Sequence, residues 1–322
     1  MIDPLQKKET SKAAVIIAYF LIYVVWGSTY YFIGVALEGL PPFLLGAIRF
    51  SIAGLILMCW CMLRGEPVFK KSLIKKSVIS GIVLLFVDMA VVMLAQQFLT
   101  SSLVAIIASS TAIWIMAFDV PMWKSNFRSP PVIIGIIIGF LGVMMLYIEQ
   151  LSIDEVQRYS EYGVLMAVDE IQNHSEYGVL ILIFGCISWS LGTLYAKYRS
   201  SGAEEVNAFA GSAWQMLFAS GAFWFFSIIL GDVSKTDLTT VPAYVWYSLA
   251  YLIVFGSILA YSAYVWLLKV RPATEVGTHA YVNPFIAVFI GMTFGKEHVT
   301  FIQMAGLVII LLSVMLISRR KI

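Results

Sequence analysis

Ionisable side chains inside long apolar stretches are the residues of this chain whose chemistry most needs an explanation. Asp88 lies near the centre of an apolar run at 77–98, and Arg49 lies about seven residues from one end of a run at 42–63. Charged groups are expensive in hydrocarbon and usually mark a partner, a cargo or an ion path. A helical rise of about 1.5 Å per residue places them at similar depths, about 10 Å for Arg49 and about 15 Å for Asp88.

Three interpretations of this pair of charges stay open. Arg49 and Asp88 could form an ion pair that holds two helices together. The Asp88 carboxylate could bind cargo or a proton, and this is compatible with the ion pair if the carboxylate is paired in one state and free in the other. Arg49 alone could extend its charged end to the nearer membrane surface.

Three further polar residues lie well inside apolar runs. Pro284 removes a main-chain hydrogen bond from its helix, and Asn283 beside it offers a donor and an acceptor to cargo or simply lies at a kink. His279 lies one helical turn earlier on the same face, where it could titrate near neutral pH or bond to a neighbour. Gln215 could line a pathway or bond across helices.

An aromatic stripe runs along the first apolar run. Tyr19, Tyr23, Trp26 and Tyr30 recur at steps of four, three and four residues, which puts them on one helical face. Such a stripe is usually packing or part of an interfacial belt. Trp26 lies too deep for a belt, so a cavity wall that suits an amphipathic or aromatic cargo is the other interpretation.

Composition places these residues in a membrane protein. Of the 322 residues, 60% are hydrophobic and 12% are charged, and the mean hydropathy is +0.88. Soluble domains are about half apolar and about a quarter charged, so a soluble enzyme is excluded. The net charge of +2 indicates no nucleic-acid-binding surface. The sequence has no HExxH, GxSxG, P-loop or GxGxxG motif and no metal-binding cluster of histidines, so we expect neither catalysis nor a cofactor.

Ten apolar runs of about 20 residues are long enough to cross a bilayer as helices. They are too long and too uniformly apolar for the strands of a membrane β-barrel. We therefore predict an all-α, polytopic membrane protein of ten transmembrane helices. The runs lie at residues 13–36, 42–63, 77–98, 102–123, 130–148, 177–197, 206–230, 243–268, 274–294 and 299–318.

Lysine and arginine are distributed unevenly between the segments that join these runs. Seventeen of the 21 fall in the segments on one side, and only Arg158, Lys235 and Lys296 fall in those on the other. Cytoplasmic segments carry the excess of positive charge, so we predict that both termini are cytoplasmic. The predicted location is the cell membrane, the inner or plasma membrane, with multiple passes.

The chain contains an internal repeat of about half its length. SSTA at 109–112 aligns with YVNP at 281–284, and WGS at 26–28 aligns with WSL at 189–191. Because each copy of the repeat has an odd number of helices, the second copy crosses the membrane in the opposite orientation to the first. Secondary transporters with such inverted repeats bind cargo near the midplane between the copies.

We therefore expect two inverted five-helix repeats, at residues 1–150 and 177–322, joined by an acidic extracytoplasmic loop at 151–176. Within this loop, IDEVQRYSEYGVL at 153–165 is nearly repeated as VDEIQNHSEYGVL at 168–180. A local duplication that lengthens a solvated loop and an acidic lid that attracts cations are the two interpretations of this tract.

Four segments carry a resemblance to a known family. They are VVWGSTYYFIG (24–34), LPPFLLGAIRFSIAGLIL (40–57), SWSLGTLYAKY (188–198) and YVNPFIAVFIG (281–291). In them the chain resembles the EamA-type transporters of the drug/metabolite transporter superfamily, and is most similar to the YedA/PecM-like branch. The resemblance covers both halves and implies a ten-helix, alternating-access carrier that usually exports small metabolites, amino acids or drugs.

Two departures from the family pattern stand out. Thr111-Ala112 occupies a place where the family often has proline, so a helix break matching that of Pro284 is not expected in the first half. Gln96 occupies a place where related sequences often have a carboxylate, which weakens any expectation of proton coupling at that position.

The expected function is secondary transport, most simply export of small organic metabolites, amino acids or drugs by alternating access. An importer of a vitamin- or sugar-like solute and a non-transporting membrane sensor or assembly protein are the alternatives. The expected partners are a small-molecule cargo, the lipid bilayer and protons as a candidate coupling ion, with oligomeric state left open. The residues predicted to bind cargo are Trp26, Tyr30, Arg49, Asp88, Gln215, His279 and Asn283.

Overall fold

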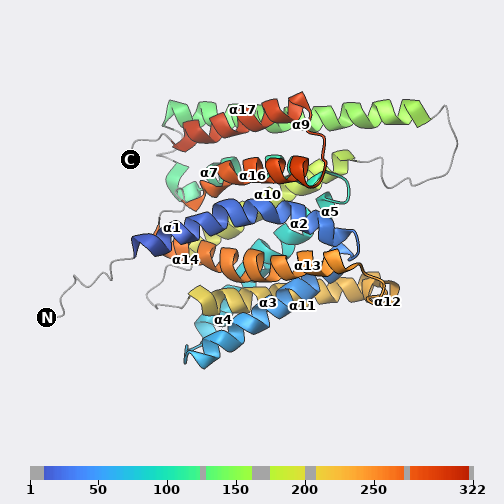
Figure 1. Ribbon diagram of the computed structural model, residues 1–322. Helices are drawn as coiled ribbons and strands as arrows, with labels where there is room; N and C mark the ends of the chain where they lie inside the picture. Colours follow the sequence, from blue (N-terminus) through green and yellow to red (C-terminus); the bar gives the residue numbers. More distant parts are fainter. Residues whose placement is uncertain (1–10, 124–127, 162–174, 200–207, 272–275, 319–322) are drawn as a thin grey trace.

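The structure, a computed structural model, is an all-helical bundle (Figure 1). It describes residues 11–123, 128–161, 175–199, 208–271 and 276–318, and these ranges contain no β-strand. The predicted all-α class is therefore confirmed.

Helical segments follow one another along most of the described chain. Segments η1, η2 and η4 are π-helical and continue the α-helices on either side of them, whereas η3 is a 3₁₀ turn. In chain order the segments are α1 (Lys12–Phe20), η1 (Leu21–Val25), α2 (Trp26–Leu37), α3 (Pro42–Leu63), α4 (Lys71–Ser80), η2 (Gly81–Val87), α5 (Asp88–Ala95), α6 (Ser101–Ala108), α7 (Thr111–Phe118), η3 (Val120–Met122), α9 (Pro130–Glu161), α10 (Ser175–Arg199), α11 (Ala208–Leu230), α12 (Asp232–Lys235), α13 (Ala243–Tyr251), η4 (Leu252–Tyr261), α14 (Ser262–Val270), α16 (His279–Thr293) and α17 (Phe301–Ser318).

Most of these helices are long and apolar enough to cross a membrane. In the described ranges eight stretches meet this condition, and two shorter apolar stretches, Val282–Thr293 and Phe301–Ser313, accompany them. Each of the ten predicted runs overlaps one of these stretches. The polytopic membrane class is confirmed, and the number of ten spans stays a prediction.

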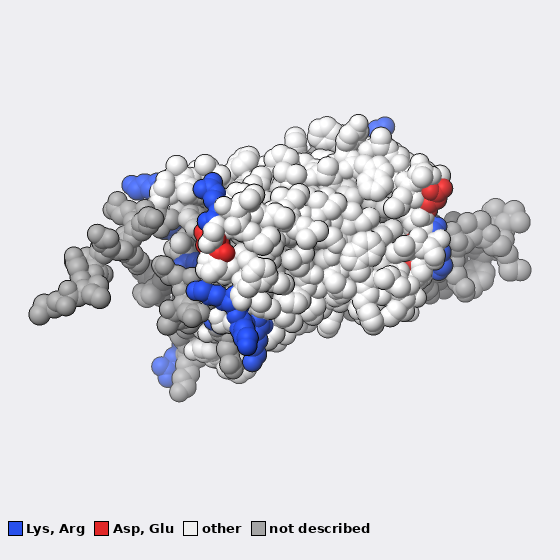
Figure 2. Space-filling view, turned by 90° about the horizontal axis from the view of Figure 1, so that it is seen from below, with Lys and Arg blue, Asp and Glu red and all other residues white. Residues whose placement is uncertain are grey.

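The surface suits a bilayer. On the face shown in Figure 2, a broad belt around the middle carries no charged side chains, and lysine and arginine gather mainly at the end of the bundle where α1 and α4 begin. Along the helices large apolar side chains are exposed, among them Leu55, Phe184, Phe225 and Phe289. Extensive apolar exposure of this kind indicates contact with lipid.

Helices of the two halves pack against each other in reciprocal pairs. Helix α3 lies along α11, and α9 lies along α17, so equivalent helices of the two halves meet (Figure 1). The first helix of each half also packs on the third helix of the other: α2 contacts α13, and α10 contacts α5. Two inverted five-helix repeats related by a pseudo-two-fold axis would produce this exchange of contacts, and the division into repeats stays a prediction.

The three π-helical segments are joined to other helices through their main-chain carbonyl groups. A π-helical turn disturbs the regular ladder of helix hydrogen bonds, and inside a membrane the affected carbonyls need donors from the protein itself. Each segment receives such a donor from a side chain on another helix. The bonds are Asn283 Nδ2 to the carbonyls of Ile22 and Tyr23 in η1 (2.9 and 2.8 Å), Ser188 Oγ to Val83 in η2 (3.0 Å) and Trp26 Nε1 to Gly256 in η4 (3.2 Å).

The fourth helical stretch is broken although it has no proline. Ser109 and Ser110 separate α6 from α7. The Ser109 amide is shared between the carbonyls of Ala105 and Ile106, and the Ser110 amide bonds only three residues back, to Ile107. The Ser109 hydroxyl also donates to the carbonyl of Ile106 (2.6 Å), a local bond by which serine competes with helix hydrogen bonds. The expectation that Thr111-Ala112 leaves the first half without a helix break is therefore wrong. Pro284, conversely, lies inside the helix α16.

Helix α9 extends beyond its predicted end at residue 148. It continues to Glu161, into the segment that was predicted as a loop at 151–176. Residues 149–161 contain neither glycine nor proline, so nothing in the local sequence ends the helix. The remainder of the near-duplicated tract, up to 174, lies outside the described residues.

Glycine permits the closest approach of the third and seventh helical stretches. A Cβ atom at Gly81 would lie 2.5 Å from the main-chain oxygen of Gln215 and 2.9 Å from its Cα atom. Main-chain atoms cannot rotate away, so η2 can pack on α11 at this distance only through glycine. At Gly221, in contrast, an added Cβ would meet nothing within 4 Å.

We expect Gly81→Ala to lower the free energy of unfolding by about 1–3 kcal/mol because the added methyl group forces η2 and α11 apart. The matched control is Gly221→Ala, which lies on α11 in open space and should keep or slightly raise stability, since alanine is the better helix former. Thermal unfolding of both variants in detergent measures the difference. Equal melting temperatures would show that the Gly81 contact does not limit packing.

Candidate functional site

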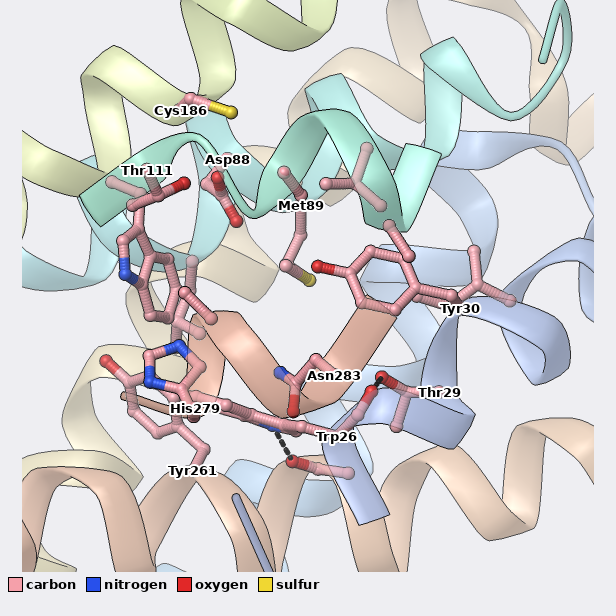
Figure 3. A pocket seen from close by; sticks show the side chains of 18 of the residues that line it. Trp26, Thr29, Tyr30, Asp88, Met89, Thr111, Cys186, Tyr261, His279 and Asn283 are labelled. Atoms are coloured by element: carbon pink, nitrogen blue, oxygen red, sulfur yellow. Dashed lines mark hydrogen bonds between the residues drawn. The ribbon is translucent and has the colours of Figure 1, made fainter. Parts of the chain in front are cut away.

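A cavity of about 90 Å³ lies between the two halves, near the middle of the helices that surround it. One cavity water needs roughly 15 Å³ on this measure, so there is room for a small organic group. Six of the seven residues predicted to bind cargo line the cavity (Figure 3). They are Trp26, Tyr30, Arg49, Asp88, His279 and Asn283.

Gln215 is the predicted site residue that does not line the cavity. Its Oε1 accepts a hydrogen bond from the hydroxyl of Tyr261 (2.7 Å), and Tyr261 itself lines the cavity. Of its two interpretations, bonding across helices therefore fits the structure. Gln215 therefore holds the cavity residue Tyr261 in place without lining the cavity itself.

Two tryptophans from equivalent places in the repeat meet in the cavity wall. Trp26 and Trp189 pack edge to face with ring centroids 5.7 Å apart, and Tyr264 packs against both, at 5.1 and 5.3 Å. Trp189 was not among the predicted site residues. The alignment of WGS with WSL was the signal that could have identified it, because equivalent positions of inverted repeats approach the same axis.

The rest of the aromatic stripe has another role. Tyr19 and Tyr23 are absent from the cavity lining, and Tyr23 shares a hydrogen bond of 2.5 Å with the hydroxyl of Thr278. Tyr30, further along the same face, does line the cavity (Figure 3). The stripe therefore divides into a packing part and a cavity part.

His279 continues the aromatic wall. Its ring lies 5.4 Å from that of Trp26 and 5.7 Å from that of Tyr264, with an edge-on geometry in both cases. Nδ1 lies 2.9 Å from the carbonyl oxygen of Val276. Because a carbonyl oxygen only accepts, this contact requires a proton on Nδ1. In the neutral ring Nε2 is then an acceptor.

Asn283 connects the cavity to the backbone of the first helix. In the orientation that its surroundings require, its amide nitrogen donates to the carbonyls of Tyr23 and Ile22 and, at 3.2 Å, to that of His279. The donor capacity of the amide is therefore used within the protein. What remains for a cargo is the acceptor, Oδ1.

Arg49 and Asp88 both line the cavity, yet no ion pair joins them. Arg49 Nε donates to Ser257 Oγ (2.8 Å), and Nη1 has no hydrogen-bond partner. Asp88 is 7% exposed, and the described residues provide no hydrogen bond to its carboxylate. The interpretation of these two residues as a structural ion pair is therefore wrong for this conformation.

Gln96, the other departure from the family pattern, is part of the scaffold. Its Nε2 donates to the carbonyl of Tyr30 (2.9 Å), and it is absent from the cavity lining. The bond holds the end of the third helical stretch against α2, so Gln96 supports the cavity residue Tyr30 through the backbone.

Several lining residues gave no signal in the sequence. Ser257, Cys186, Thr111 and Met89 are small or weakly polar and are common inside apolar helices. Such residues are uncharged and cost little to bury in a membrane. The signal that identified Asp88, a charge inside an apolar run, is therefore absent for them.

These features define a polytopic helical membrane protein with a cavity between its helices. The chain belongs to the EamA-like transporter family, which matches it twice, over residues 13–148 and 176–319. This membership confirms the resemblance seen in the four sequence segments.

Relatives of similar length carry transporter names. The uncharacterized inner membrane transporter YedA of Escherichia coli K12 is 29% identical over 307 residues, covering 94% of this chain and 90% of YedA. The uncharacterized transporter YvbV of Bacillus subtilis 168 is 24% identical over 316 residues, covering 97% of this chain and 93% of YvbV. A solved crystal structure is similar in fold, with a TM-score of 0.63 and 16% identity over 95% of this chain and 96% of its own.

We expect Asn283→Ala to lower the free energy of unfolding by about 1–3 kcal/mol, because it leaves the carbonyls of Ile22 and Tyr23 without their side-chain donor. Hydrogen exchange should also become faster along η1. The control is Thr293→Ala, whose hydroxyl donates to Phe289 within the same helix at an exposed position. If both variants unfold alike in detergent, the bonds of Asn283 to η1 do not stabilise the protein.

Proposed function

We propose that this protein is a secondary transporter that exports small organic metabolites, amino acids or drugs by alternating access. The observation that carries the proposal is the cavity between the halves, whose wall holds the charges of Arg49 and Asp88 without pairing them. Charged groups at such a depth are costly unless a ligand or an ion meets them. Rocking of residues 1–150 against 177–322 would open this cavity to one side of the membrane at a time.

Asp88 is the proposed coupling residue. It lines the cavity, and its Oδ1 faces α10, where a Cβ at Gly185 would lie 3.7 Å away. A carboxylate that holds a proton in one state and cargo or water in the other links proton movement to rocking. The sequence contains no nucleotide-binding motif, so an ion gradient or the gradient of the cargo itself would drive transport.

The two alternatives make different demands on the site. A sensor or assembly protein would use its intramembrane polar residues to hold the helices together, as Asn283 and Gln215 do. Asp88 does not fit that role, because it lines the cavity and no described residue bonds to its carboxylate, and Arg49 uses only its Nε for such a bond, to Ser257. An importer would use the same cavity in the opposite direction.

The proposed location is the cell membrane with both termini in the cytoplasm. Helices α1 and α17 support this orientation, because α17 ends at the end of the bundle where α1 begins (Figure 1). Lysine and arginine gather at that same end in Figure 2, as cytoplasmic segments require.

The direct test of transport compares cells with and without the protein. Profiling of small molecules in the cells and in the medium reports cargo and direction together. A solute that accumulates in the medium only when the protein is present supports export, and one that accumulates inside supports the importer. Purified protein in liposomes should then move that solute, and a failure to move it would contradict the proposal.

We expect Asp88→Asn to lower the initial rate of transport about tenfold or more, or to abolish its dependence on pH, because the amide keeps the shape of the carboxyl group but cannot release a proton. The rate is measured in everted vesicles or proteoliposomes across the physiological pH range. The control is Asp237→Asn, an exposed residue outside the membrane whose carboxylate bonds to Thr239. Unchanged transport and pH dependence in Asp88→Asn would remove Asp88 from the mechanism.

A further inference from the structure

Arg49 is fixed in the cavity wall while most of its hydrogen-bonding capacity is unused. A guanidinium group has five N–H donors, and the described residues accept only one of them, through Ser257 Oγ. The side chain is 3% exposed, so water at the protein surface does not supply the missing acceptors. A permanently charged group in this condition indicates a site for an anion.

The contacts of the guanidinium group determine which of its edges is available. Nε bonds to Ser257, and Nη2 faces Gly256, where a Cβ atom would lie only 3.1 Å away. The plane also packs near the Phe50 ring, with Cζ 5.0 Å from its centroid. These contacts hold Nε and Nη2 against η4, while Nη1 is buried and has no hydrogen-bond partner among the described residues.

Gly256 also connects Arg49 to the aromatic wall. Its carbonyl oxygen accepts the Trp26 indole N–H (3.2 Å), so the Trp26 ring and the Arg49 guanidinium group lie next to the same residue. Trp189 then extends the aromatic surface beyond Trp26. An anionic group bound at Arg49 would therefore carry the rest of its molecule onto these rings.

We propose that Arg49 binds the carboxylate of a monocarboxylic cargo whose flat, apolar part lies against Trp26 and Trp189. The carboxylate oxygens accept from the free guanidinium N–H groups, and the Ser257 hydroxyl, already an acceptor for Nε, can donate its own proton to the same anion. Asp88, elsewhere in the wall, disfavours a second carboxylate by repulsion. This inference rests on the proposed transport function and names the class of cargo.

Three small probes of nearly the same shape test the proposal on the full-length protein in lipid nanodiscs. Benzoate carries the carboxylate, benzamide is its neutral counterpart, and benzylamine is a cation. We expect benzoate to bind at least about tenfold more tightly than benzamide, because only benzoate supplies a charged acceptor to Arg49. Calorimetric titration or ligand-induced shifts in melting temperature measure the three affinities.

Variants assign the preference to Arg49. Arg49→Gln should reduce the preference for benzoate to within about twofold, and Arg49→Lys should restore part of it, since lysine keeps the charge but not the planar donors. Arg64→Gln is the matched control, because Arg64 lies beyond the end of α3 and outside the cavity lining. If Arg49→Gln does not fold, Ser257→Ala gives the same information through a benzoate affinity reduced about threefold or more.

Failure of this inference can be distinguished from failure of the transport proposal. No binding of benzoate, equal affinity for benzoate and benzamide, tighter binding of benzylamine, or an unchanged preference in Arg49→Gln would each overturn the carboxylate site. Selective benzoate binding without exchange of any carboxylate across liposomes would instead keep the site and overturn transport.

Discussion

The rest of the structure depends on one constraint: main-chain carbonyls inside a membrane must find donors within the protein. The helices that the structure describes contain three π-helical segments, and each of these has a carbonyl that bonds to a side chain on another helix. Two of the donors, Asn283 and Trp26, also line the cavity. The same bonds that satisfy the backbone therefore hold the cavity wall in place, and the irregular helix geometry lies where the two halves meet.

The halves are similar in arrangement but not in chemistry. Trp26 and Trp189 come from aligned segments and meet in the cavity, so the aromatic wall follows the repeat. The charges do not. The internal repeat also aligns the helix around Gly46 with the helix around Gly211. In that alignment Trp214 takes the place of Arg49, and its indole N–H bonds to the carbonyl of Val68 outside the cavity. In the proposed transport mechanism, the repeated scaffold would provide two related conformations for rocking. The charges, which lie on one half only, would orient a bound cargo.

Sequence reasoning succeeded where a single physical cost dominates. Long apolar runs predicted the helices, and the cost of burying charge in hydrocarbon identified Arg49 and Asp88 as residues of one site. That cost does not specify a partner. Of the interpretations left open for the two charges, the ion pair is not found in this structure, and Gln215 lies behind the wall instead of in it. The break at Ser109 was missed because hydroxyl groups, not proline, interrupt the helix there. These outcomes depend on side-chain geometry between helices, which apolar patterning does not encode.

The separation of Arg49 from Asp88 is itself built into the fold. Ser257 accepts from Nε on the η4 side of the guanidinium group, and Gly256 leaves space there that any larger residue would fill, with Nη2 and Thr29 both 3.1 Å from an added Cβ. An ion pair across the cavity would satisfy both charges and so remove the reason for either to bind anything else. Held apart, each charge keeps its capacity for a ligand or a proton. An empty site with two unpaired charges has a higher free energy than one in which they are paired. In the proposed mechanism, this difference favours binding of a molecule that reaches Arg49 and leaves Asp88 free to exchange its proton.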